Sequence, residues 1–276
     1  NTAKGLPWSC VSAGSQTVHA MTRAAHAAAT DLKTKLQEVA AKIRGGNPAS
    51  YTVANGKVGS LTFAEVARKA IELGGKYDGH EGPEDINVFT KNALKVVAGM
   101  GLVGVAKDTY KRDGNTHSFV AAFAEVEVDT ETGAWRIVDY TSVADVGTVL
   151  HPRNLQGQTF GGSMLGMGHA ISQRWVYDKQ YGVCLARRFH HNKPPSIMDI
   201  PATIKWDATN IPDPETPVGA RGIGEPPVGA GCGAVAAALV NALGAEAFRR
   251  YPMTPDLLLT SIESKTWQHD ALTAHI

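Results

Sequence analysis

Two runs of β-forming residues in the middle of the chain constrain its fold more than any other feature. Residues 118–128 and 134–143 are rich in Val, Ala, Phe and Ile, and the turn residues Asp, Thr, Glu, Thr and Gly lie between them. This pattern predicts a β-hairpin. Apolar residues at helical spacing occur before and after it, so helices are expected on both sides. The alternation of helical and strand segments indicates an α+β fold.

Two helices and a second, shorter hairpin are expected in the N-terminal third. The first helix covers residues 18–44 and ends where two glycines, an asparagine and a proline follow, since these residues stop helices. An Asn-Gly pair at residues 55–56 predicts a type I′ turn. Thr62 and Glu65 have the spacing of a capping box. That box should begin a helix that ends near residue 73.

The C-terminal half mixes helices with extended segments. Small and apolar residues at helical intervals predict helices over 158–171 and 228–243, and Pro255 suits the first position of a last helix. We expect a hairpin over 175–185 and a proline-rich extended traverse over 194–217. Such a traverse should lie on a surface or at a subunit contact.

The chain should divide into two segments. Gly, Asp, Glu and Asn dominate residues 74–87, which predicts an irregular connection there. We therefore expect a helix-and-hairpin segment over residues 1–85 and a C-terminal α+β segment over residues 86–276.

Composition favours small-molecule chemistry. The 27 Lys and Arg residues are balanced by 26 Asp and Glu residues, so no net charge favours nucleic acid or an anionic membrane. No apolar stretch is expected to approach the length of a membrane span, and the N-terminus lacks the pattern of a signal peptide. A soluble protein is expected. Its compartment, cytoplasmic or periplasmic, stays open, as does membrane association through partners.

Cysteine usage argues against a metal cluster held by this chain. The three cysteines, Cys10, Cys184 and Cys232, are far apart and form no C-x-x-C pair, unlike the ligands of zinc or iron–sulfur sites. Each thiol is more simply a small, buried apolar side chain. His190 and His191 have no accompanying ligand cluster, so they are interpreted as solvated or interface residues. If electrons must leave, another chain carries them.

A single carboxylate, that of Glu225, lies inside a run of glycine, proline and small apolar residues over 219–233. Pro226 should push the Glu225 backbone toward an extended conformation. Gly222 and Gly224 would permit close approach by a ligand or another backbone. Burial in such surroundings would raise the pKa of the glutamate toward that of a useful base. The alternative is that Glu225 merely caps the helix that follows.

The same run carries a resemblance to a known family. Gly219-Ala-Arg-Gly-Ile-Gly-Glu-Pro-Pro227, followed by a small-residue helix and Pro252-Met-Thr-Pro255, resembles the C-terminal signature of xanthine dehydrogenases, aldehyde oxidases and their bacterial relatives. Residues 123–133, Asp145-Val-Gly147 and residues 151–162 match the family in the same order. The resemblance implies the C-terminal portion of the α+β molybdenum-cofactor-binding domain. It also implies that Glu225 is the catalytic base.

The resemblance also implies cofactor-binding residues. Gln158 matches a glutamine that hydrogen-bonds the pterin, and a helix start with free N–H groups would suit that role. The simpler alternative is a helix glutamine bonded to its own backbone. Near the N-terminus, a loop of small and hydroxylated residues resembles the one that grips the pterin and its phosphate, although capping alone could explain one of its hydroxyls. That loop consists of Ala13, Gly14, Ser15, Gln16 and Thr17.

The implied activity is oxidation of an aldehyde to a carboxylate, or hydroxylation of an N-heteroaromatic carbon, with oxygen from water. The implied cofactor is molybdopterin cytosine dinucleotide, whose dithiolene holds the metal, so no protein metal ligand is expected. Electrons would pass to [2Fe–2S] clusters on an iron–sulfur partner chain, with a flavin (FAD) or cytochrome subunit as a further carrier. Molybdenum subunits of this family are far longer than this chain, so the remaining part of the subunit is also an expected partner.

Two other functions are also compatible with the sequence. One is a non-catalytic scaffold or assembly subunit that keeps the family fold. The other is a hydrolase that uses Glu225 without a metal.

Overall fold

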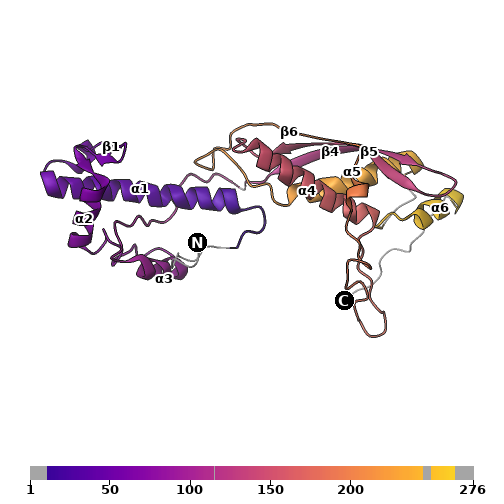
Figure 1. Cartoon of the computed structure of the whole chain (residues 1–276), viewed down its shortest axis with the longest axis horizontal. Helices are drawn as coiled ribbons and strands as arrows, with labels where there is room; N and C mark the ends of the chain where they lie inside the picture. Colours follow the sequence, from indigo (N-terminus) through magenta and orange to yellow (C-terminus); the bar gives the residue numbers. More distant parts are fainter. Residues whose placement is uncertain (1–10, 115, 245–249, 265–276) are drawn as a thin grey trace. The chain divides into compact units, whose positions relative to one another are not determined.

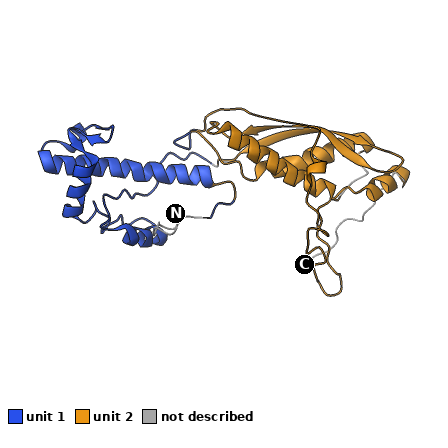
Figure 2. Ribbon diagram, in the orientation of Figure 1, with its two compact units in different colours: residues 1–13, 17–115, 214–218 blue, residues 14–16, 116–213, 219–276 orange. Residues whose placement is uncertain are grey.

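The computed structural model describes residues 11–114, 116–244 and 250–264, and the chain forms two compact units (Figure 2). Unit 1 consists of residues 1–13, 17–115 and 214–218, and unit 2 of residues 14–16, 116–213 and 219–276. The units therefore separate near residue 115 rather than near residue 85. The irregular segment 74–87 is tied into unit 1, because Tyr77 accepts a backbone hydrogen bond from Val103.

Unit 1 is built around one long helix. Its helices are α1 (Thr17–Arg44), α2 (Phe63–Leu73) and α3 (Val88–Val97), with a 3-10 turn η2 (Pro48–Ser50). Its small antiparallel sheet has the order β1 (Val53–Ala54), β2 (Lys57–Val58), β3 (Leu61–Thr62). The buried core lies between α1, α2 and this sheet, and consists of Leu36, Val39, Ala40, Val58, Leu61, Val66 and Ala70.

Local signals in unit 1 are confirmed by the structure. Asn55 and Gly56 both have positive φ, 50° and 73°, as a type I′ turn requires. Both halves of the Thr62 and Glu65 capping box are present. Helix α3 was not predicted, although Asn87 caps it by accepting a hydrogen bond from the Thr90 backbone N–H.

Unit 2 is a three-stranded sheet covered on one face by helices (Figure 1). The predicted hairpin is confirmed as β4 (Phe119–Val128) and β5 (Trp135–Asp145), which are antiparallel with a register shift between Glu125 and Val126. The third strand, β6 (Thr203–Ala208), lies parallel to β5. The segment predicted as an extended traverse thus contains a paired strand, together with the 3-10 turn η3 (Ile197–Asp199).

Helices α4 (Pro152–Ile171) and α5 (Pro226–Leu243) pack closely on each other, and α6 (Pro255–Ser264) begins at Pro255 as predicted. The close packing depends on glycine: a Cβ at Gly166 would overlap the Val228 carbonyl oxygen, and one at Gly231 would crowd that of Ser163. The core beneath consists of Ile137, Tyr140, Met167, Ala170, Val235, Ala236, Leu239, Met253 and Leu258.

Two helix starts differ from their predicted positions. Helix α4 begins six residues earlier, at Pro152, because His151 caps it by accepting from the Asn154 backbone N–H at 3.1 Å. Helix α5 begins at Pro226, since prolines fit the first helical positions, whose N–H groups have no intrahelical partner. The predicted hairpin over 175–185 is reduced to one bridge between Tyr177 and Cys184.

Helix α5 contradicts the expectation that no apolar stretch approaches the length of a membrane span. With 18 residues it is long and apolar enough, by length and composition alone, to cross a membrane. In the structure it contacts α4 and β4 and supplies Val235, Ala236 and Leu239 to the core. Packing inside unit 2 thus buries part of this apolar helix.

Candidate active site

Glu225 ends the glycine-rich loop and is the N-cap residue of α5. Its φ and ψ are −101° and −26°, so the prediction of an extended backbone is wrong. The cause is a turn in which the Glu225 carbonyl oxygen accepts from the Val228 backbone N–H at 2.9 Å. The side chain makes no capping hydrogen bond. The helix-cap alternative for this carboxylate is therefore wrong as well.

Both carboxylate oxygens of Glu225 are bound by two residues more than 200 positions earlier in the chain. The Gly14 backbone N–H donates to Oε1 at 2.9 Å, and the Ser15 hydroxyl donates to Oε2 in a short hydrogen bond. The same hydroxyl accepts from the Glu225 backbone N–H at 2.8 Å. Gly14, Ser15 and Glu225 all belong to unit 2. The carboxylate is thus held in one orientation.

The pKa of Glu225 is shifted in the direction opposite to the one expected. Its side chain is exposed rather than buried. The hydrogen bonds from Ser15 and Gly14 lower the pKa of the carboxyl below its ordinary value, and the small opposing effect of burial does not offset them. Donors that bind the charged form favour it. Glu225 is consequently ionised at neutral pH.

The glycines near Glu225 permit the close approach of another backbone, as predicted. A Cβ at Gly222 would overlap the Ser15 carbonyl oxygen, and one at Gly224 would lie 3.0 Å from the Ser15 hydroxyl oxygen. A larger residue at Gly222 would push the two loops apart, whereas one at Gly224 would require only a small shift of the Ser15 hydroxyl. Glycine at position 222 is therefore required by the neighbouring segment of the same chain.

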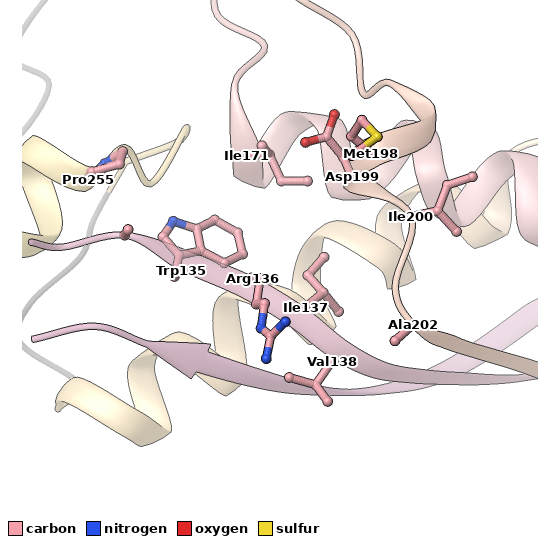
Figure 3. A pocket seen from close by; sticks show the side chains of 11 residues that line it. Trp135, Arg136, Ile137, Val138, Ile171, Met198, Asp199, Ile200, Ala202 and Pro255 are labelled. Carbon is pink, nitrogen blue, oxygen red and sulfur yellow. The ribbon is translucent and has the colours of Figure 1, made fainter.

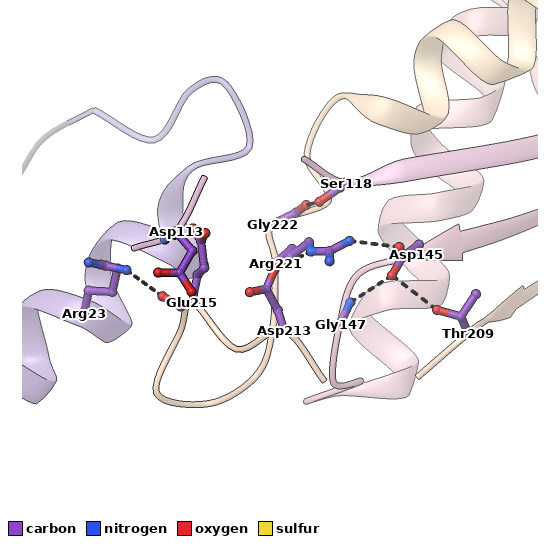
Figure 4. Close-up of polar contacts among 10 residues, drawn as sticks. All are labelled: Arg23, Asp113, Ser118, Asp145, Gly147, Thr209, Asp213, Glu215, Arg221 and Gly222. Carbon is purple, nitrogen blue, oxygen red and sulfur yellow. Dashed lines mark hydrogen bonds and ion pairs between the residues drawn. The ribbon is translucent and has the colours of Figure 1, made fainter. Parts of the chain in front are cut away.

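Arg221 anchors the start of the Glu225 loop (Figure 4). Its guanidinium binds Asp213 through Nε at 2.5 Å and Asp145 through a terminal nitrogen at 2.9 Å. These carboxylates raise the Arg221 pKa further above its ordinary value. The Ser118 hydroxyl also donates to the Gly222 carbonyl oxygen. Arg221 and Ser118 were not identified from the sequence, where nothing links them to their partners.

Gln158 is positioned differently from its prediction. It is the seventh residue of α4 and not at a helix start, so the argument from free N–H groups and the helix dipole does not apply. Its exposed side chain donates from Nε2 to the Gly224 carbonyl oxygen at 2.9 Å. It does not bond its own helix backbone through this nitrogen. Gln158 and Glu225 are therefore linked through the peptide that precedes the glutamate.

The predicted loop 13–17 is divided between the two units. Gly14 and Ser15, in unit 2, have left-handed φ values of 63° and 56°, and Gln16 beside them is exposed. Ala13 and Thr17 belong to unit 1, where Thr17 is the first residue of α1 and its hydroxyl bonds that of Ser12 at 2.6 Å. The Ser15 hydroxyl thus binds Glu225 and does not act as a helix cap.

Two of the three cysteines are among the described residues. Cys184 and Cys232 are free, partly buried thiols, and burial raises the pKa of Cys232. Cys10 falls outside the described residues. In the part of the chain that the structure describes, no three His, Cys, Asp or Glu residues gather into a possible metal site.

A cavity of about 500 Å³ opens at the start of β5 (Figure 3), and none of the predicted site residues lines it. Its walls include Trp135, Ile171 and Met198.

Comparison with known proteins finds a cofactor-binding family model and relatives among oxidoreductases. The family model described as a molybdopterin cofactor-binding domain matches residues 1–201. The chain is 29% identical over 246 residues to a probable hypoxanthine oxidase of Escherichia coli (strain K12), covering 87% of this chain and 23% of that protein. It is 26% identical over 231 residues to the aldehyde oxidoreductase molybdenum-binding subunit of Escherichia coli O157:H7, covering 83% of this chain and 28% of that protein.

A solved structure agrees with the fold. The chain matches a Cu,Mo-CO dehydrogenase with a TM-score of 0.68 and 24% identity, over 94% of this chain and 31% of that one. This confirms the predicted α+β architecture. The chain spans about a quarter of the length of these curated relatives.

Proposed function

The chain belongs to the molybdopterin cofactor-binding domain family, and from this premise we propose that it is part of a molybdenum hydroxylase with Glu225 as its catalytic base. The substrate class would be an aldehyde or an N-heteroaromatic compound. One observation carries the proposal: an exposed, ionised carboxylate is held by dedicated hydrogen bonds on the loop that resembles the family signature. The names of the curated relatives, a hypoxanthine oxidase and an aldehyde oxidoreductase, support both substrate classes.

The lowered pKa keeps Glu225 ionised and therefore able to accept a proton, but it also makes the free carboxylate a weaker base than the burial expected from the sequence would have made it. An ionised carboxylate has about four lone-pair positions, and Gly14 and Ser15 occupy one on each oxygen. Each oxygen keeps one position that can accept a proton. A base must lie within hydrogen-bond reach of the proton it removes, and the exposure of Glu225 leaves its carboxylate accessible to a ligand.

The donor and acceptor set around Glu225 fits a polar pterin. With Nε2 of Gln158 bound to Gly224, its amide oxygen Oε1 can accept from a pterin N–H. We propose Gln158 and the loop of residues 13–17, through groups other than the Ser15 hydroxyl, as the cofactor contacts, and molybdopterin cytosine dinucleotide as the cofactor. When bound, this group supplies the oxidation and oxygen-transfer chemistry. The residues of this chain orient it and move the proton.

The overall reaction requires partners. An aldehyde and water give a carboxylic acid with release of two protons and two electrons, and Glu225 would take one of these protons. The free thiols of the described residues do not form a cluster that could carry electrons. We propose that the electrons pass to [2Fe–2S] clusters on an iron–sulfur subunit, and then to a flavin or cytochrome subunit. The remaining part of the molybdenum subunit would complete the substrate pocket.

The test is analysis of the native complex that contains this chain. Elemental analysis should find molybdenum, and mass spectrometry of the released pterin should give the mass of the cytosine dinucleotide form. The same experiment should identify iron–sulfur and longer molybdenum-subunit chains. A complex that lacks molybdenum would overturn the proposal and favour a scaffold or a metal-free hydrolase.

A further inference from the structure

The Ser15 hydroxyl contacts two atoms of Glu225, one in the side chain and one in the main chain. The hydroxyl donates to the carboxylate and accepts from the Glu225 backbone N–H, which uses its single proton and one of its two lone pairs. The adjacent Gly14 N–H binds the other carboxylate oxygen. Both the main chain and the side chain of the glutamate are therefore tied to the same pair of residues.

The local backbone is shaped for this contact. Ser15 adopts a left-handed φ of 56°, which is unfavourable for residues other than glycine and a few polar types. Such a conformation persists when surrounding contacts determine it. Two glycines opposite, Gly222 and Gly224, leave the space that Ser15 occupies. Backbone conformation, glycine spacing and hydrogen bonds all bring Ser15 onto Glu225.

We propose that Ser15 is a positioning residue for Glu225, whose hydroxyl fixes the orientation of the carboxylate before any cofactor is bound. This inference rests on the proposed role of Glu225 as a base. It also changes the role of Ser15 suggested by the family resemblance, because a hydroxyl that donates its only proton to Glu225 has none to give to a cofactor phosphate. The Ser15 side chain serves the base, and the rest of the loop serves the cofactor.

The contact between Ser15 and Glu225 can be measured through the pKa of Glu225. The causes of the lowered Glu225 pKa are hydrogen bonds from Ser15, Gly14 and the residue's own backbone, with burial opposing them. Among the described residues no charged side chain contributes to this shift. Loss of the Ser15 hydroxyl should therefore appear directly in the titration of Glu225.

The experiment is a carboxyl-carbon NMR titration of the 276-residue chain without cofactor, with labelled glutamate and with Glu225→Gln used to assign its signal. Ser15→Ala removes the hydroxyl and keeps the Cβ, whereas Ser15→Gly also relieves the left-handed backbone. In both variants we expect the Glu225 pKa to rise toward the ordinary value for glutamate. An unchanged Glu225 pKa in both variants would overturn the proposal.

Glu65 supplies a matched control in the same spectra. Its pKa is also lowered, by hydrogen bonds from the Thr62 backbone and hydroxyl. Thr62→Ala should raise the Glu65 pKa and leave that of Glu225 unchanged, while Ser15→Ala should do the reverse. A Ser15 substitution that raised both pKa values would indicate general unfolding and would count against a specific role.

A second variant guards against misfolding of the Ser15 substitutions. Gly222→Ala keeps the hydroxyl but should push the Ser15 carbonyl away from the loop, so it too should raise the Glu225 pKa. An unchanged pKa in this variant would contradict the proposal. These titrations need no molybdenum. The role of Ser15 can therefore fail while the native complex still contains the cofactor. Conversely, the Glu225 pKa can respond to Ser15 in a complex that lacks molybdenum, which would overturn only the proposed function.

Discussion

Gln158 holds the peptide that precedes Glu225: its side-chain Nε2 donates to the Gly224 carbonyl oxygen at 2.9 Å. Helix α4 packs against α5 and the sheet of unit 2, so this hydrogen bond connects the loop of the candidate base to the packed core of the unit. The glutamine amide leaves its oxygen for a ligand. One side chain can thereby hold the loop of the candidate base and serve the proposed contact with the cofactor.

Replacement of Gln158 by alanine should lower the cofactor content of the native complex. Loss of one direct hydrogen bond costs about 0.5–1.5 kcal/mol, so cofactor affinity should fall by up to about tenfold. Molybdenum per complex, measured by elemental analysis, tests this. Gln180→Ala changes an exposed turn glutamine and should have no effect. Full molybdenum occupancy in Gln158→Ala would contradict the role.

Replacement of Glu225 by glutamine should leave the molybdenum content near that of the wild type and lower turnover by about 10²- to 10⁴-fold. This is the usual contribution of a general base, and it acts on the transition state rather than on cofactor binding. Steady-state rates with an aldehyde or N-heteroaromatic substrate provide the measurement. Glu131→Gln, in the exposed β4–β5 turn, is the control. Unchanged turnover in Glu225→Gln would rule out the assignment.

The pH dependence of the reaction should reflect the lowered Glu225 pKa. The hydrogen bonds from Ser15 and Gly14 favour the charged form, so the base should stay ionised below the ordinary pKa of glutamate. We expect kcat/KM to be maintained as pH falls to that value and to decline only through the lowered pKa. The acid limb should move to higher pH in Ser15→Ala. An acid limb that did not move would show that another group controls it.

Two glycines of α4 should respond oppositely to alanine. Gly166 faces the α5 backbone, where a Cβ would overlap the Val228 carbonyl oxygen, so Gly166→Ala should destabilise the fold by about 1–3 kcal/mol. Gly161 is exposed with no atom near its Cβ position, and Gly161→Ala should stabilise the helix by up to about 1 kcal/mol. Chemical denaturation of the chain measures both. Equal effects would contradict the described α4–α5 packing.

The Arg221 ion pairs should contribute more to stability than exposed ones. Asp213 is nearly buried, and removal of the partner of a buried charge costs about 3 kcal/mol or more. Arg221→Leu should therefore lower the free energy of unfolding by about that amount. Arg136→Leu, which breaks a well-exposed pair with Glu127, should cost less than about 1 kcal/mol. Similar losses for both variants would show that the Arg221 pairs do not anchor the loop.

Elements governed by neighbours in sequence were predicted well. The Asn55–Gly56 turn, the Thr62 and Glu65 capping box and the β4–β5 hairpin each depend on residues a few positions apart, so their signals are contained in short stretches of sequence. Helix starts were less accurate, because His151 and the prolines 226 and 227 extend α4 and α5 beyond their periodic apolar residues. Strand β6 was missed, since its identity depends on pairing with β5.

The sequence by itself determined the α+β class and the family, and it made Glu225 the candidate base, because a carboxylate inside a glycine- and proline-rich run with a collinear family pattern is visible in the residue order alone. Only the tertiary structure decided the environment of that carboxylate. Ser15 lies 210 residues from Glu225, and no local pattern indicates that its hydroxyl binds the carboxylate and lowers its pKa. A pKa depends on what surrounds a group in space, and those neighbours are brought together by the packing of distant segments.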